Sequence, residues 1–248
     1  MMIKMKDQKL ILEKIKQKAD GLGLEFNPKI FVVNFLTKRG VNIISYLCMN
    51  PRYDKFGKNA KQRANNLTKF LHSEEIKEGT KGTVVNKRSI LQYESLLKDT
   101  EHMRMFEKLT KGFKFNTAGY GPLVERSGFD SVQKNEIIFH EWAHTLLSYN
   151  KLGFYDTGED RWKYNEGLAI FVEYYLGSYH DRDVGSLKDR LEWTKKYGNK
   201  VPFDKFLKYA DIFIKLAEGP ATPNKRRDAL FKFFKEFKAP DKAKRWPS

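Results

Sequence analysis

Hydrophobic residues recur at helical spacing between Ser131 and Tyr149, and this pattern predicts the most clearly defined helix of the chain. Asp130 or Ser131 suits the first turn of this helix, because a short polar side chain accepts hydrogen bonds from the free N–H groups there. The sequence Asn150-Lys151-Leu152-Gly153 then ends the helix. The repeating apolar positions are Val132, Ile137, Ile138, Trp142, Leu146 and Leu147.

A second helix is predicted from about Arg161 to Leu176. It follows an acidic turn, Asp156-Thr157-Gly158-Glu159-Asp160, which offers capping residues. These acidic residues do not have the spacing of a calcium-binding loop, so we interpret them as turn and capping residues. The connection is long enough for the chain to reverse direction, and we therefore expect the second helix to lie beside the first.

The rest of the pattern predicts an α+β fold. A surface helix near the N-terminus ends at Gly21-Leu22-Gly23, and the run from Lys29 to Phe35 predicts a buried strand. Residues 60 to 110 are predicted to be mainly helical. Gly119-Tyr120-Gly121 favours either an ordinary glycine turn or an edge strand that pairs with an extended substrate.

The last predicted helix, around Asp228 to Lys238, carries one apolar stripe and several lysines. A helix of this kind either packs onto the core of its own domain or docks on an anionic membrane. Packing onto the core is the favoured interpretation, because phenylalanines at helical spacing are usually buried. The stripe is formed by Leu230, Phe233, Phe234 and Phe237.

Composition indicates a folded chain in a reducing compartment. Of its 248 residues, 40% are hydrophobic and 14% aromatic, which argues against disorder. The single cysteine, Cys48, excludes an intrachain disulfide. We see neither the apolar segment of a signal peptide nor a run that spans a membrane, and we expect a soluble, cytoplasmic protein.

The net charge of +16 comes mainly from lysines spread along the chain. Such a charge attracts anionic partners weakly, although scattered lysines most often form a solvated surface. No nucleic-acid-binding module is recognisable, so nucleic acid is not predicted as a partner.

The predicted helix at 131–149 carries His140-Glu141-Trp142-Ala143-His144. Residues four apart on a helix share one face, so both imidazoles can turn toward one zinc ion, and Glu141 can reach the open coordination position. The alternative is a pair of partly buried histidines satisfied by hydrogen bonds. Glu166, on the second predicted helix, supplies a third ligand if the two helices meet, and this set leaves the fourth position to water.

The segment Asn165-Glu166-Gly167-Leu168-Ala169-Ile170-Phe171-Val172-Glu173-Tyr174 resembles the third-ligand helix of the gluzincin metallopeptidases, especially the aminopeptidase branch. The resemblance covers residues 131 to 177. It implies a zincin-like fold, with an N-terminal lobe (1–150) containing a small mixed sheet and a helical C-terminal lobe (151–248), together forming one peptidase domain. It also implies that Zn²⁺ is bound by His140, His144 and Glu166, and that Glu141 is the general base and later the acid.

The chain departs from this family in three ways, the first being a gap between His144 and Glu166 slightly longer than in the large aminopeptidases. It lacks the Gly-Ala-Met-Glu-Asn motif that binds a free N-terminus, so endopeptidase and aminopeptidase activities are both open. Some relatives carry a histidine-orienting aspartate where this chain has Ile170. Glu173, seven residues after Glu166 and on the same helix face, is the predicted substitute, although it is also readable as a surface glutamate or a substrate-amine contact. Asn165 is predicted to support the ligands beside it.

Gluzincins also use a tyrosine or histidine to stabilise the oxyanion. Tyr197 and His180 are the favoured candidates. Tyr174, Tyr175, Tyr179 and Tyr209 follow the same helix and are more typical of packing aromatics.

The pattern as a whole predicts a zinc-dependent peptidase acting on a peptide or protein substrate. Two alternatives remain: a catalytically silent zinc-binding protein, against which the intact Glu141 argues, and a basic nucleic-acid-binding protein in which the motif is incidental.

Overall fold

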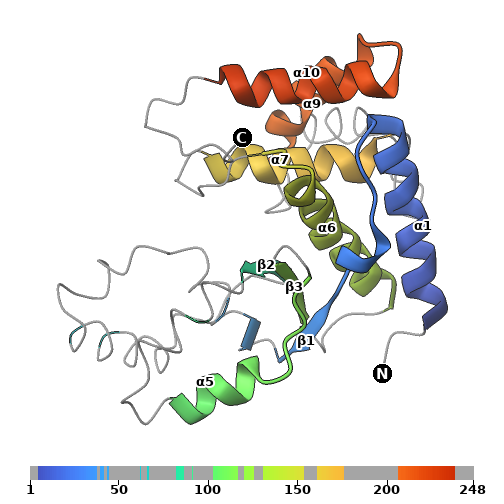
Figure 1. Ribbon diagram of the computed structural model, residues 1–248. Helices are drawn as coiled ribbons and strands as arrows, with labels where there is room; N and C mark the ends of the chain where they lie inside the picture. Colours follow the sequence, from blue (N-terminus) through green and yellow to red (C-terminus); the bar gives the residue numbers. More distant parts are fainter. Residues whose placement is uncertain are drawn as a thin grey trace, which may run out of the picture. The chain divides into compact units, whose positions relative to one another are not determined.

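The described part of the computed structural model contains α-helices and a small sheet (Figure 1). The chain divides into two compact units, one of residues Lys29–Glu141 and the other of Met1–Pro28 together with Trp142–Ser248. The predicted α+β class is thus correct at the level of helices combined with a mixed sheet. The described residues are 5–37, 40–41, 44, 62, 66, 82–86, 91, 103–116, 120–125, 131–153, 161–175 and 206–237.

The sheet, within the described residues, has three strands in the order β1-β3-β2. Strand β3 (Tyr120–Glu125) pairs in parallel with β1 (Asn34–Leu36) and antiparallel with β2 (Gly82–Asn86). The predicted edge strand is therefore wrong at Tyr120 and Gly121, because both belong to the middle strand; Gly119 lies outside the described residues. A side chain at Gly121 would approach the Lys114 carbonyl oxygen to 2.5 Å, so this position is closely packed.

A buried asparagine ties β1 to the segment that precedes β3. Asn34 Nδ2 donates to the carbonyl oxygens of Lys114 and Pro122 at 3.0 and 3.2 Å, and its Oδ1 accepts from the Lys114 N–H at 2.7 Å. All of these groups would lose water on burial, so their mutual pairing removes a desolvation penalty.

Two predictions about strands and helices in this unit need correction. The predicted strand from Lys29 to Phe35 is correct only at its end, because Pro28–Ile30 form a 3-10 helix (η1) and β1 begins at Asn34. The mainly helical prediction for residues 60 to 110 is wrong at β2, where the β-branched run Thr83-Val84-Val85 favours an extended backbone. It is correct at helix α5, Met103–Thr110.

The second unit contains helices α1 (Met5–Leu22), α7 (Arg161–Tyr174), α9 (Leu207–Glu218) and α10 (Pro223–Glu236). Helix α9 packs against both α7 and α10, and α1 packs against α10 (Figure 1). Helix α1 therefore groups with α9 and α10, and the boundary between the two units falls after Glu141. None of the helices described is long and apolar enough to cross a membrane.

Helix α10 packs onto the core of this unit, as predicted. The ring of Phe234 stacks on Phe213 of α9 at 5.6 Å, and Phe233 meets the same ring edge-on at 5.4 Å. Pro223 in the first turn and the Thr222 hydroxyl, which accepts from the Lys225 N–H, start the helix five residues before the predicted Asp228. Capping residues therefore set the start of this helix ahead of its apolar stripe.

Candidate metal centre

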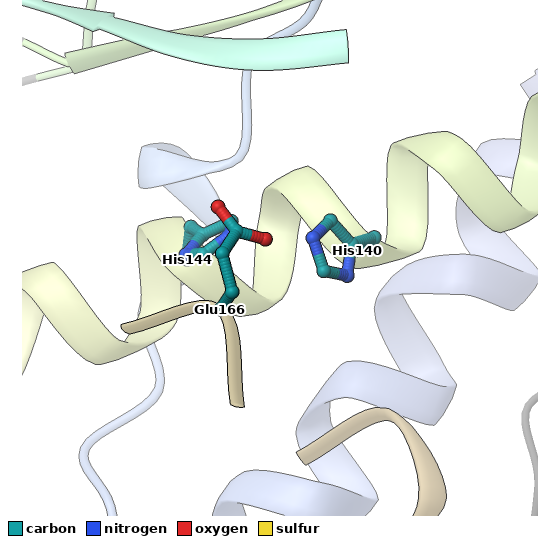
Figure 2. A group of neighbouring side chains, drawn as sticks. All are labelled: His140, His144 and Glu166. Atoms are coloured by element: carbon teal, nitrogen blue, oxygen red, sulfur yellow. The ribbon is translucent and has the colours of Figure 1, made fainter. Parts of the chain in front are cut away.

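Helix α6, Ser131–Tyr149, carries the predicted histidine pair, and its bounds agree with the prediction. It runs unbroken through the boundary between the two units. Phe139, Trp142 and Ala143 are buried, whereas His140 and His144 are only partly buried. Figure 2 shows both imidazoles on successive turns of this one helix. The helical backbone alone therefore sets the spacing between the two histidines.

The C-terminus of α6 is closed by a Schellman motif. The Leu152 N–H bonds to the Leu147 carbonyl oxygen at 2.9 Å and the Lys151 N–H to that of Ser148 at 3.1 Å. Lys151 sits in the left-handed region at φ 55°, a position that glycine usually occupies. The sequence correctly predicted the end of the helix, although Lys151 gives no signal for this backbone conformation.

Asn150 and Tyr149, at the C-terminal end of α6, form hydrogen bonds with Glu25, which follows α1 in the chain. Asn150 Oδ1 accepts from the Glu25 N–H at 2.8 Å, and its Nδ2 donates to the Glu25 carbonyl oxygen at 2.9 Å. The Tyr149 hydroxyl donates to Glu25 Oε1 at 3.0 Å. Helix α6 thus has a fixed end point within its unit.

Glu166 comes from α7, the second predicted helix, which ends at Tyr174 rather than at Leu176. From Gly167 to Glu173 every residue of this helix is buried. A helix buried on all sides has little freedom to shift, because each side is in contact with a neighbour. Glu166 directly precedes this buried stretch, and its side chain has 23% of its surface exposed.

The tertiary structure brings Glu166 to the histidine pair. Glu166 Oε2 lies 3.5 Å from His144 Nε2. One ligand atom from each of His140, His144 and Glu166 can be chosen so that all three lie within 4.8 Å of one another. Figure 2 shows the carboxylate facing the imidazoles from a segment outside α6. Among the described residues this is the one group of three such side chains that can hold a metal ion.

The spacing of these donors fits a small divalent cation. Donors about 2.1 Å from a tetrahedral zinc ion stand roughly 3.4 Å apart. The His144–Glu166 separation of 3.5 Å already matches this value, and the largest separation, within 4.8 Å, exceeds it by at most about 1.4 Å. Glu141, between the two histidines in sequence, is buried with 5% of its surface exposed.

The residues predicted to support the ligands lie on α7. Glu173 is buried, with 5% of its surface exposed, so the alternative of a surface glutamate is wrong. Burial lowers the pKa of Lys18 and the charge of Glu173 partly opposes this shift, whereas the predicted bond of Glu173 to a ligand imidazole stays a prediction. Asn165 lies against Gly153, where a Cβ would come 2.7 Å from Asn165 Oδ1. Ile170 is fully buried and belongs to the core.

Both favoured oxyanion donors, Tyr197 and His180, lie outside the described residues. Two other tyrosines have packing roles. The Tyr175 hydroxyl donates to the Gly21 carbonyl oxygen at 3.4 Å, and burial raises its pKa while Arg226 opposes that rise. Tyr209 meets Tyr164 edge-on at 4.9 Å.

Lys18, a residue of α1, is buried against the C-terminal end of α7, and the sequence did not predict this. Its ammonium group donates to the carbonyl oxygen of Tyr175, just after the last turn of α7. Burial lowers the pKa of Lys18 to about 8, although Glu173 opposes the shift. The position gives no signal in the sequence, because Lys18 is one of several lysines in an amphipathic helix.

Comparisons with known proteins leave the site to be interpreted on its own geometry. A scan against protein-family models, a search of curated proteins and a search of solved structures each found no match.

Proposed function

We propose that this chain is a zinc-dependent metallopeptidase. The observation that supports this best is the convergence of His140, His144 and Glu166, with donor atoms within 4.8 Å of one another. The two histidines share one helix, but Glu166 comes from another helix 22 positions further along the chain than His144. This spacing supports metal binding, because two imidazoles and a carboxylate bound to one zinc ion must converge from different parts of the chain.

The type of donor favours zinc. Two imidazoles and one carboxylate are a common catalytic zinc set, and three protein ligands leave a fourth position open. Magnesium and calcium prefer all-oxygen sites, whereas two of the three side chains in this group are imidazoles. A bound zinc ion would lower the pKa of a water molecule and polarise a carbonyl group.

In this proposal Glu141 carries the proton. It would accept one from the attacking water and deliver it to the leaving amine nitrogen, which makes it both base and acid. Its burial, with 5% of its surface exposed, supports this role, because exclusion of bulk water limits the loss of the proton to solvent.

The resemblance to gluzincins supplies the finer parts of the proposal. They are a zincin-like fold, a supporting role for Glu173 and Asn165, and oxyanion stabilisation by Tyr197 or His180. The substrate is a peptide or protein, and the choice between endopeptidase and aminopeptidase is open.

Zinc content and peptide cleavage, measured together, test the proposal. Zinc per chain is measured by elemental analysis after gel filtration, and cleavage is measured on a mixed peptide library with free or acetylated N-termini. Glu141→Gln is expected to keep zinc and to lower cleavage by about 10²- to 10⁴-fold, the usual contribution of a general base. Glu218→Gln, an exposed glutamate at the end of α9, is the matched control and should cleave like the wild type.

Each outcome distinguishes the alternatives. Cleavage of free but not acetylated peptides would identify an aminopeptidase. Stoichiometric zinc without cleavage would indicate a catalytically silent protein, and absence of zinc together with salt-dependent nucleic-acid binding would indicate that the motif is incidental. Cleavage that survives Glu141→Gln would contradict the assigned mechanism.

A further inference from the structure

Glu166 has a neighbour on each side in sequence that is in unusually close contact with the rest of its unit. Gly167 follows it, and a Cβ at Gly167 would lie 2.4 Å from Tyr209 Cβ, 2.8 Å from the Tyr209 carbonyl carbon and 2.9 Å from the Ala210 nitrogen. The backbone of α7 therefore lies directly on the backbone of α9 at this point. Glycine in the middle of a helix costs about 1 kcal/mol relative to alanine, so the close approach explains why glycine is needed here.

Asn165 precedes Glu166 and contacts a different segment. Its Oδ1 would lie 2.7 Å from a Cβ at Gly153, the glycine that follows the Schellman motif of α6. Gly153 has φ +100°, so its backbone conformation disfavours a side chain, and an added Cβ would also displace the Asn165 amide. The first turns of α7 thus rest against the end of the helix that carries the histidines.

These two contacts limit the movement of Glu166 in different directions. One holds α7 against α9, and the other holds it against the turn that ends α6. Metal ligands tolerate errors of only about 0.2 Å in their distances. An added methyl group at Gly167 falls about 1 Å short of ordinary contact, which begins near 3.4 Å, so α7 would have to move away from α9 and carry Glu166 with it.

We propose that Asn165 and Gly167 are positioning residues, which hold the Glu166 carboxylate at the distance from His144 that metal binding requires. This inference rests on the proposed metal-binding function. It gives Asn165 a specific partner, Gly153, and it assigns Gly167 a role that its chemistry alone does not suggest. Neither residue supplies a ligand itself.

Metal affinity measured on folded protein tests this inference. Zn²⁺ affinity is determined by competition with a chromophoric chelator, well below the melting temperature, for the wild type, Gly167→Ala and Asn165→Ala. Both variants are expected to bind zinc roughly 10- to 100-fold more weakly, as when other groups that orient ligands are removed. The visible absorption of bound Co²⁺, which depends on ligand number and geometry, should change in the same variants.

Gly219→Ala is the matched control. A Cβ at Gly219 meets nothing within 4 Å, and its backbone is in the right-handed helical region, so alanine should be tolerated. This variant should keep the zinc affinity and the Co²⁺ spectrum of the wild type. Circular dichroism establishes that each variant is folded. If Gly167→Ala does not fold, Asn165→Ala still tests the inference, because alanine at position 165 is compatible with a helix.

Two results would contradict the proposals in different ways. A wild type that binds no zinc would overturn the proposed function and with it this inference. A wild type that binds zinc, with folded Asn165→Ala and Gly167→Ala binding it within twofold of the same affinity and giving the same Co²⁺ spectrum, would overturn the positioning role alone.

Discussion

The two helices that meet at the candidate metal centre fix their ligands by different means. In α6, His140 and His144 are four residues apart, and hydrogen bonds within the helix set their separation. In α7, the position of Glu166 relative to the histidines depends on contacts with other segments, at Gly153 and at Tyr209. One part of the site is therefore built by local structure, and the other by packing.

This difference predicts different responses to mutation. Changes that leave α6 helical should leave the histidine pair intact, even where they weaken the fold. Changes in the packing of α7 should affect the metal site, because Glu166 moves with its helix. Mutations that leave α6 helical are thus expected to change stability without changing metal affinity, whereas mutations in the packing of α7 should change both.

Removing a ligand should have the largest effect. For the wild type, free zinc at a thousand times its dissociation constant should raise the free energy of unfolding by about 4 kcal/mol, because only the folded state presents the three ligands together. For His144→Ala this zinc-dependent gain should vanish. Urea unfolding with zinc or with a chelator measures it, and magnesium in place of zinc is the control that should give no gain. An equal zinc-dependent gain in His144→Ala would exclude His144 as a ligand.

Titration of Lys18 should have the next largest effect. Its pKa is lowered from 10.5 to about 8 in the folded protein, so the unfolded state binds more protons between these values. The free energy of unfolding should therefore rise with pH through this window, by up to about 3 kcal/mol, as the cost of burying the charge disappears. The measurement is urea unfolding of the wild type and Lys18→Met at several pH values.

The difference between these two proteins isolates Lys18 from all other groups that titrate in this range. The wild type should gain stability relative to Lys18→Met as the pH rises from 8 to 10.5. A constant difference would show that the buried ammonium group carries no such cost.

Loss of the Asn150 side chain should have an intermediate effect and should separate stability from metal binding. Asn150→Ala removes the two hydrogen bonds to the backbone of Glu25 and should lower the free energy of unfolding by about 2 kcal/mol. Zinc affinity should stay within about twofold of the wild type, because α6 itself remains helical. Asn224→Ala, on the exposed first turn of α10, is the control and should change stability by less than about 0.5 kcal/mol. A large fall in zinc affinity in Asn150→Ala would contradict the local origin of the histidine pair.

The smallest expected effect is a gain in stability at Lys151. Helix α1 ends in the same type of motif with Gly23 at φ 65°, whereas α6 ends with Lys151 at φ 55°. Lys151→Gly should relieve the steric conflict of the side chain and stabilise the protein by up to about 1 kcal/mol. Lys151→Ala keeps the Cβ and should give no comparable gain. Thermal unfolding measures both, and equal stabilities for the two variants would contradict the steric explanation.

Local signals in the sequence predicted the helices well. The bounds of α6 and the start of α7 follow from apolar spacing and capping residues, and these signals act over one or two turns. Strands were predicted less well, because β1 and β3 pair across about 90 residues and no local pattern records that pairing. The short strand β2 was missed although its β-branched residues Thr83, Val84 and Val85 are a local signal for an extended backbone.

The sequence by itself determined that His140 and His144 share one face of a helix and that Glu166 lies on the next helix in this region. Only the tertiary structure decided that Glu166 reaches His144 and that β3 is the middle strand of the described sheet. It also decided that Lys18 of α1 is buried against the end of α7. The physical reason is the range of the interactions. Hydrogen bonds inside a helix join residues four apart, whereas packing joins segments whose separation in the chain leaves no repeating pattern to read.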